Sequence, residues 1–230
     1  PRGPRAGSRA EICFHQSHCY HAPLRPAPHP PEHDAPGFTM DKPRGRRTRV
    51  FGMTHHIRRA TAADAGPLAE LAAITFPLAC PPESRPEDIA AHLANTLSEG
   101  NFRAYLSDPD VTVLVLDADG ALRGYSLLVD RPTQDPDVSA VLEAVPSTEL
   151  SKCYVHPDHH GLGAAAELMQ ASITAAAAAG AQGLWLGVNS QNARAIRFYE
   201  KSGFRKVGTK SFRLGTTVEH DFVMERPLAP

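Results

Sequence analysis

A turn with two glycines, set between a strand and a long helix, places the strongest constraint on how this chain can fold. The turn covers residues 156–163, and Gly161 and Gly163 lie near its end. Residues 149–155 read as a strand before it, and the alanine-rich residues 164–179 read as a helix after it. Glycines at a helix start leave backbone N–H groups uncovered, and the helix dipole adds about half a positive charge there. The turn therefore predicts a site for an anion such as a diphosphate.

A second strand and a second helix follow. Gly180 ends the long helix, as a glycine at a helix C-terminus commonly does. Residues 184–188 are apolar and read as a buried strand, and residues 192–202 read as a helix with Asn192 at its start. Because a crossover helix joins strands in a right-handed connection, we expect the strands 149–155 and 184–188 to be parallel.

These two segments together resemble the motifs of the Gcn5-related N-acetyltransferase (GNAT) superfamily. The family's phosphate turn reads Gln or Arg, any, any, Gly, any, Gly or Ala. The matching residues here are His160, Gly161, Leu162, Gly163, Ala164 and Ala165. The strand 149–157 and the stretch 192–204 also match the family's pattern and come in the right order. The resemblance extends more loosely over residues 57–228.

The resemblance implies an α/β (α+β mixed) fold with a central mixed, mostly antiparallel sheet flanked by helices. Its two central parallel strands splay apart, and acetyl-CoA lies in the gap. It also implies an N-acetyltransferase that moves the acetyl group of acetyl-CoA directly to a primary amine. The acceptor is then a small molecule, polyamine-like or another amine, or a peptide. Two alternatives stay open: a non-catalytic domain that senses acetyl-CoA, and a protein N-terminal or lysine acetyltransferase.

The cofactor-binding residues are expected on the turn and on the strand before it. The phosphate cradle consists of the backbone N–H groups of Gly161, Leu162, Gly163, Ala164 and Ala165. His160 replaces the family's Gln or Arg, and it either contacts the phosphate or only shapes the turn. By the resemblance, Cys153, Tyr154 and Val155 offer backbone groups to the pantetheine arm. Asn192 either contacts that arm or caps its helix.

Two residues are expected to carry the proton transfers. Tyr199 matches the family's tyrosine near the thioester sulfur, and a phenol with a pKa of about 10 can protonate a departing thiolate. An alkylamine with a pKa near 10.4 is only about one part in 10³ neutral at pH 7, so a base is needed. Glu149 is the first candidate, ahead of His156 and His220. The alternatives are a core aromatic for Tyr199 and an exposed carboxylate for Glu149.

The rest of the domain supplies the other elements of the sheet and its cover. A capping box at residues 61–64 starts a helix whose inward positions are Leu68, Leu71, Ala72 and Ile74. A second helix begins near Pro86. Residues 111–116 and 122–129 form a hairpin, and residues 204–212 and 218–226 form a closing antiparallel pair. Glu83, in the loop between the helices, is either a site for a cationic amine or an exposed carboxylate.

Residues 1–52 differ in composition, and we expect a disordered tail there, followed by one acetyltransferase domain at 53–230. Proline, arginine and histidine are frequent without apolar periodicity, so the segment cannot bury enough apolar surface to fold. Two clusters invite other interpretations, a metal site and a nucleic-acid contact. They are Cys13, His15, His18, Cys19 and His21, and Lys42, Arg44, Arg46, Arg47 and Arg49. We expect a solvated tail instead.

Composition limits the expected partners. The 24 basic and 25 acidic residues nearly balance, which predicts no general attraction to nucleic acid or anionic membranes. No apolar run approaches about 18 residues, and the four cysteines form no metal or disulfide pattern. We expect a cytoplasmic enzyme that uses acetyl-CoA as donor, needs no metal and contacts no membrane. A homodimer is compatible with the sequence.

Overall fold

The computed structural model describes residues 48–50, 53–80, 84–214 and 217–228. Its centre is a sheet of eight described strands in the order β1-β2-β3-β4-β5-β6-β8-β7. The strands are β1 Thr48–Val50, β2 Met53–Arg59, β3 Val111–Ala118, β4 Ala121–Val129, β5 Ser147–Val155, β6 Gly183–Asn189, β7 Arg205–Leu214 and β8 Thr217–Pro227. The pair β5–β6 is parallel and the other neighbouring pairs are antiparallel. The expected mixed, mostly antiparallel sheet is confirmed.

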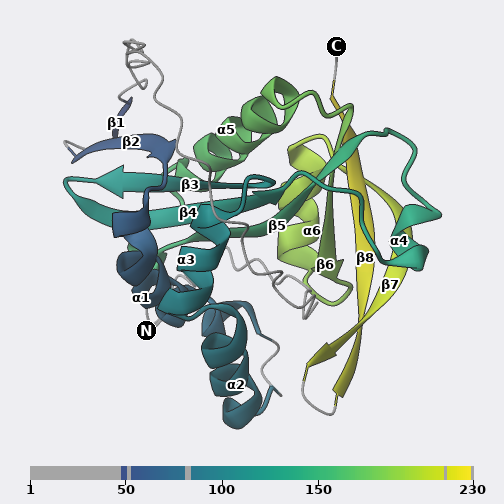
Figure 1. Ribbon diagram of the computed structural model, residues 1–230, viewed down its shortest axis with the longest axis horizontal. Helices are drawn as coiled ribbons and strands as arrows, with labels where there is room; N and C mark the ends of the chain where they lie inside the picture. The colour runs from purple at the N-terminus through teal and green to yellow at the C-terminus, as the bar shows by residue number, and fades with distance from the viewer. Residues whose placement is uncertain (1–47, 51–52, 81–83, 215–216, 229–230) are drawn as a thin grey trace, which may run out of the picture.

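Helices cover both faces of this sheet. They are α1 Ala65–Thr75, α2 Pro86–Thr96, α3 Glu99–Ser107, α4 Pro136–Ser139, α5 Ala164–Ala178 and α6 Ala193–Lys201. Three short 3-10 helices join them, namely η1 Ala62–Asp64, η2 Pro77–Ala79 and η3 Pro157–His159. In the view of Figure 1, α5 lies above the sheet, and α1, α2 and α3 lie below it. The expected long helix, second strand and second helix around the glycine turn are confirmed to within one or two residues.

Two apolar cores lie on the two faces of the sheet, because side chains along a strand alternate in direction. On β3, Leu114 and Leu116 belong to the core under α5, whereas Val113 and Val115 belong to the core under α1 and α3. The α5 core also takes in α6 through Tyr199. Hence α5 and α6 cover one face, which we call the α5 face, and the other is the α1 face.

The helical region before β3 differs from the sequence prediction in two ways. The sequence predicted two helices, and the structure has three. Helix α3 begins after Ser98, whose Oγ accepts a hydrogen bond from the Asn101 N–H, and it buries Phe102 in the α1-face core. Ile74 was predicted to face inward but is 48% exposed. The buried stripe of α1 follows Leu68, Leu71 and Thr75, and Ile74 lies beside it.

The predicted capping box at residues 61–64 is confirmed, although it starts η1 rather than α1 directly. One carboxylate oxygen of Asp64 accepts from the Thr61 N–H at 2.7 Å and from the Thr61 hydroxyl at 2.9 Å. The Arg58 guanidinium donates to both carboxylate oxygens of Asp64 at 2.8 Å. These bonds, above all those from Arg58, lower the pKa of Asp64 to about 2. The box therefore fixes the start of α1 against β2.

The N-terminal expectations fall mostly outside the described residues. Residues 1–47 lie outside them, and with them the cysteine–histidine cluster and most of the basic cluster. Glu83 lies outside them as well. Strand β1 falls within the segment 1–52, and it pairs with β2 from Thr48–His55 to Val50–Met53. The sequence pattern did not indicate this strand.

The segment between β4 and β5 covers the α1 face of the last three strands. Val138 of α4 packs with Trp185 of β6 and Val223 of β8 in a third, small core. The buried Glu225 carboxylate accepts hydrogen bonds from the backbone N–H groups of Glu143 and Ala144, at 2.9 and 3.0 Å. The segment is therefore pinned to the sheet just before β5 begins.

Candidate functional site

The two parallel strands pair only at their beginnings. The register between β5 and β6 covers Ser147–Glu149 and Gly183–Trp185. Beyond that point β5 continues to Val155 in register with β4, and β6 continues to Asn189 in register with β8. We call the separated parts, Leu150–Val155 and Leu186–Asn189, the split. The splayed parallel strands that the resemblance implied are therefore present in the described chain.

The glycine turn lies at the end of β5. Gly161 and Gly163 have φ angles of +75° and +87°, which favour glycine, and Gly163 is the N-cap of α5. A Cβ placed on Gly161 would meet no heavy atom within 4 Å, so the outer side of the turn is open. The Ala166 and Glu167 N–H groups bond to the Gly163 carbonyl at 2.9 and 3.0 Å. The N–H groups before them belong to the helix's first turn, where no intrahelical acceptor exists. This arrangement suits an anionic ligand.

His160 ties the turn to the end of β5. Its Nε2 lies 2.8 Å from the Val155 carbonyl oxygen, and the imidazole donates this hydrogen bond. The ring is therefore oriented by the strand, which supports its role in shaping the turn. A contact between His160 and a phosphate stays a prediction, as does the contact of Leu162 with the cradle.

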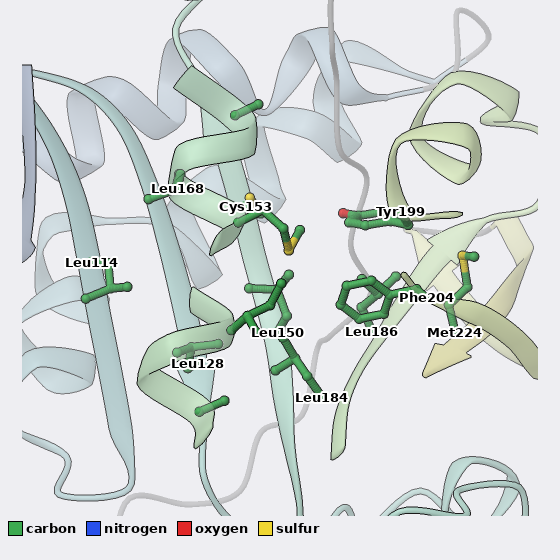
Figure 2. Packing of buried hydrophobic residues seen from close by; sticks show 14 of the residues in the cluster. Leu114, Leu128, Leu150, Cys153, Leu168, Leu184, Leu186, Tyr199, Phe204 and Met224 are labelled. Carbon is green, nitrogen blue, oxygen red and sulfur yellow. The ribbon is translucent and has the colours of Figure 1, made fainter. Parts of the chain in front are cut away.

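Tyr199 lies on the α5 face beside the split. Its side chain is 0% exposed and its ring packs edge-on against Phe198 and Phe204, each with ring centroids 5.7 Å away. In Figure 2 the phenol oxygen points toward the β5 side, where Cys153 lies. Burial raises the pKa of Tyr199 well above 10, with smaller contributions from Cys153 and Tyr154. The phenol therefore keeps its proton at neutral and moderately alkaline pH.

Cys153 and Tyr154 point to opposite faces of β5. Cys153 is buried in the α5-face core, and burial raises the pKa of its thiol to about 12. Since the thiolate is the nucleophilic form, this environment argues against covalent catalysis by Cys153. The Tyr154 ring lies in the α1-face core, 5.4 Å from that of Tyr125. The contact of the backbone groups of Cys153, Tyr154 and Val155 with a pantetheine arm stays a prediction.

Glu149 lies where the split begins, on the α1 face. It is the last β5 residue in register with β6, opposite Trp185, and it pairs with Val129 of β4. Its side chain is half-buried. Tyr199 and Glu149 therefore lie beside the same split but on opposite faces of the sheet. The roles of Tyr199 as acid and Glu149 as base stay predictions.

The asparagine positions are occupied by capping contacts. The Asn192 side-chain oxygen accepts from the Ala195 N–H at 3.0 Å, which makes it the N-cap of α6. The Asn189 side-chain oxygen accepts from the Gln191 N–H at 2.8 Å. The capping interpretation of Asn192 is thus confirmed, and its contact with a cofactor stays a prediction.

Sequence reasoning did not single out four buried charged residues on the α1 face. They are Lys152, Lys210, Asp221 and Glu225. The available signal was a charged residue at an inward position of an otherwise apolar strand, but it depends on knowing the strand register. In the described ranges no three His, Cys, Asp or Glu side chains are grouped to hold a metal ion. No helix in the described part of the chain has the length and apolarity to cross a membrane.

Comparisons with known proteins agree with this geometry. The Acetyltransferase (GNAT) family matches residues 72–204. An uncharacterized N-acetyltransferase of Mycobacterium bovis is 46% identical over 165 residues, which cover 72% of this chain and 98% of the relative.

Solved structures share the fold. The PaiA N-acetyltransferase of Thermoplasma acidophilum, in complex with coenzyme A, aligns with a TM-score of 0.62 and 21% identity over 76% of this chain and 99% of that one. YncA of Salmonella typhimurium, a putative acetyltransferase with its cofactor acetyl-CoA, aligns with a TM-score of 0.52 and 24% identity over 76% and 95%. On the family match and the mycobacterial relative, the chain belongs to the Acetyltransferase (GNAT) family of acyltransferases.

Proposed function

We propose that this enzyme transfers the acetyl group of acetyl-CoA directly to a primary amine of a small molecule or peptide. The observation that carries the proposal is the split between β5 and β6, which ends at a glycine turn that opens into the first turn of α5. A diphosphate on the turn and a pantetheine arm along the split fit these two features together. Two of the structural relatives hold coenzyme A or acetyl-CoA, which supports the same donor here.

The donor is held by backbone groups in this proposal. The N–H groups of residues 161–165 bind the diphosphate, and the pantetheine arm lies along Cys153, Tyr154 and Val155. The buried methyl groups of Ala164 and Ala165 keep side chains out of the cradle. Asn192 holds α6 in place beside the arm through its cap.

The proton transfers then divide between the two faces. Glu149 takes a proton from the acceptor's ammonium, directly or through water, because only the neutral amine attacks the thioester carbonyl carbon. A C–N bond forms and the C–S bond breaks. The Tyr199 hydroxyl gives its proton to the departing thiolate and regains one from the acetylated nitrogen or from solvent. Burial favours the protonated phenol, which suits it to act as the acid.

A thiol-release assay with acetyl-CoA and a panel of amines and peptides tests this function. We expect turnover with at least one class of acceptor, and a loss of about 10²–10⁴ in kcat for Glu149→Gln. Glu143→Gln is the matched control, because this glutamate is exposed and pairs with Arg205 away from the split. Binding of acetyl-CoA without turnover of any acceptor would favour a sensor domain and contradict the proposal.

The remaining expectations are proposals of the same kind. We propose that the acetyltransferase domain covers residues 53–230, that the enzyme acts in the cytoplasm, and that it needs no metal. A chelator in the thiol-release assay addresses the last point: unchanged turnover in its presence is expected, and a loss restored by added metal would contradict it.

A further inference from the structure

Buried charged side chains gather on the α1 face around the split. Lys210 is 4% exposed, Lys152 is 7% exposed and Asp221 is 0% exposed. Lysine is almost never fully buried unless it has a partner. Lys152 has a partner, because its Nζ donates a hydrogen bond to Ser151 Oγ at 3.3 Å. The burial of Lys210 on the same face is the observation to be explained.

The backbone register places Lys152 on the same face as Glu149. Leu127 of β4 pairs with Lys152, but the next residue, Leu128, pairs with Leu150, so Ser151 is an extra residue in β5. Because of this bulge, the side chains of Glu149 and Lys152 point to the same face although they are three residues apart, whereas a regular strand needs an even spacing. Consistent with this, Lys152 Nζ lies 5.2 Å from the ring centroid of Tyr105, whose side chain packs in the α1-face core.

Lys210 reaches the split from the far edge of the sheet. It lies on β7 opposite Asp221 of β8, and its side chain crosses β8 to reach β6. A Cβ on Gly187 of β6 would lie 2.9 Å from Lys210 Cε, 3.4 Å from its Nζ and 3.4 Å from Asp221 Oδ2. Only a glycine at position 187 leaves room for this path. The ammonium ends 5.6 Å from the ring centroid of Trp185, the residue that pairs with Glu149.

The Lys210 ammonium ends near an aromatic ring and acidic side chains. Its Nζ lies 5.6 Å from the Trp185 ring centroid, and the charges of Glu149 and Asp221 act on it. Burial lowers the pKa of Lys210, and the charges of Glu149, Asp221 and Asp135 oppose that shift. The Asp135 side chain is the N-cap of α4, because its Oδ1 accepts hydrogen bonds from the N–H groups of Asp137 and Val138.

The charge balance of this face favours one kind of acceptor. Lys152 and Lys210 are basic, and Glu149 and Asp221 are acidic, whereas the buried Glu225 carboxylate is occupied by the Glu143 and Ala144 N–H groups and by Arg205. An acceptor with two ammonium groups would bring unbalanced positive charge into a buried site, at a high desolvation cost. An acceptor with one ammonium and one carboxylate adds no net charge, and each of its groups meets the opposite sign.

We propose that the acceptor carries a carboxylate close to the amine that is acetylated, and that Lys210, with Lys152, binds this carboxylate while Glu149 faces the amine. The proposal rests on the proposed acetyl transfer and narrows its acceptor class to amino-acid-like amines. Lys210 is then a specificity-determining residue. Polyamine-like acceptors, one of the classes that the resemblance left open, become the poorer substrates.

Matched acceptor pairs test the proposal without any substitution. Lysine with 1,5-diaminopentane, ornithine with 1,4-diaminobutane, and phenylalanine with phenethylamine differ only by the carboxylate. In the thiol-release assay we expect the carboxylated member to have the higher kcat/KM by about tenfold or more in at least one pair. Equal or better turnover of the decarboxylated members would overturn the proposal and leave the acetyl transfer standing. Absence of turnover with all members would overturn the proposal, and the wider panel of amines and peptides then tests the acetyl transfer separately.

Two substitutions on β7 test whether the preference for carboxylated acceptors depends on Lys210. Lys210→Met should lower kcat/KM for the carboxylated acceptor by about tenfold or more, mainly through KM, and change the decarboxylated partner far less. Lys206→Met is the control, because Lys206 is exposed on the same strand and lies over the Phe222 ring, 3.5 Å from its centroid. An equal loss for both acceptors in folded Lys210→Met protein would contradict the role of Lys210. Lys152→Met is a second, independent test, and it too should lower kcat/KM for the carboxylated acceptor more than for its decarboxylated partner.

Discussion

The paired and the separated halves of β5 and β6 have different surroundings. In the paired half, Gly183 lies against the backbone of Ala144, where a Cβ would come within 2.6 Å of the carbonyl oxygen. In the separated half, Gly187 lies against the end of a lysine side chain, and Tyr199 lies on the opposite face. One half is packed against backbone and the other against side chains that carry protons. We infer that the paired half sets the angle between the strands, with the proposed base Glu149 at its last position, and we propose that acetyl transfer takes place beside the separated half.

The largest effect is expected from Tyr199→Phe in the separated half. Loss of the hydroxyl removes the proton donor and little packing, so kcat should fall by about 10²–10⁴. The affinity for acetyl-CoA and the melting temperature should change little. Thiol release at saturating acceptor, calorimetry and thermal unfolding measure the three quantities. Unchanged kcat would show that Tyr199 is only a core aromatic.

The pH dependence of the wild-type enzyme tests the same residue. The acid form of Tyr199 is the active one, and burial raises its pKa above the ordinary value. Its proton is therefore lost only above about pH 10, and kcat should show no descending limb below that pH from this group. A descending limb that appears near pH 8 and is abolished by Tyr199→Phe would contradict the raised pKa of Tyr199.

A smaller but clear effect is expected from Gly183→Ala in the paired half. The new methyl group meets the rigid backbone of Ala144, so the free energy of unfolding should fall by about 1–3 kcal/mol. Gly66→Ala in α1 is the control, because its nearest neighbour would be 3.8 Å away and alanine favours helix. The control should be neutral or stabilising by up to about 1 kcal/mol. Urea unfolding measures both, and equal behaviour of the two variants would argue against a rigid paired half.

Asp64, outside both halves, sets a baseline for acid stability. Its folded-state pKa of about 2 lies below the ordinary 3.8, so its contribution is present above pH 3.8 and is lost as the pH falls toward 2. We expect about 1–2 kcal/mol of such stability. Asp64→Asn should lower stability at pH 7 and flatten its pH dependence between pH 4 and 2. Denaturant unfolding measures the free energy of unfolding across that range. The account would be contradicted if this free energy changed with pH equally in the two proteins.

The smallest effect on stability is expected from Gly187→Ala. The new methyl group meets the flexible end of Lys210, which can move, so the free energy of unfolding should change by less than about 1 kcal/mol. The displaced ammonium should still reduce the preference for carboxylated acceptors several-fold. Gly187→Ala and Gly183→Ala therefore form a matched pair on one strand. A loss of stability as large as that of Gly183→Ala would remove the distinction between the halves.

The glycine turn and its flanking elements could be predicted because their signals are local. Gly161 and Gly163 need positive φ angles, and α5 and α6 follow from helix propensity and a capping asparagine. Helix α3 was missed because Glu99, Gly100 and Asn101 make its first turn polar, and Phe102 is its one fully buried residue. Ile74 was misplaced because its position is one residue away from a stripe set by tertiary packing.

The charged part of the site could not be predicted for a topological reason. Strand β8 follows β7 in the chain but lies between β7 and β6 in the sheet. The approach of Lys210 to Gly187 depends on that order and on the length of a lysine side chain. Likewise, Lys152 shares a face with Glu149 only because Ser151 is an extra residue in the strand. Neither relation is visible in the spacing of the residues along the chain.

Calorimetric titration of acetyl-CoA into Gly161→Asp and Gly161→Asn tests the central claim most directly. Both side chains tolerate positive φ, and a Cβ at this position has open space, so the variants differ mainly by one negative charge. We predict that the wild-type protein binds acetyl-CoA, that the Asn variant binds less than about tenfold more weakly, and that the Asp variant binds at least about tenfold more weakly than the Asn variant. Equal affinities of the two variants, or no heat of binding with folded wild-type protein, would contradict a diphosphate site at the glycine turn.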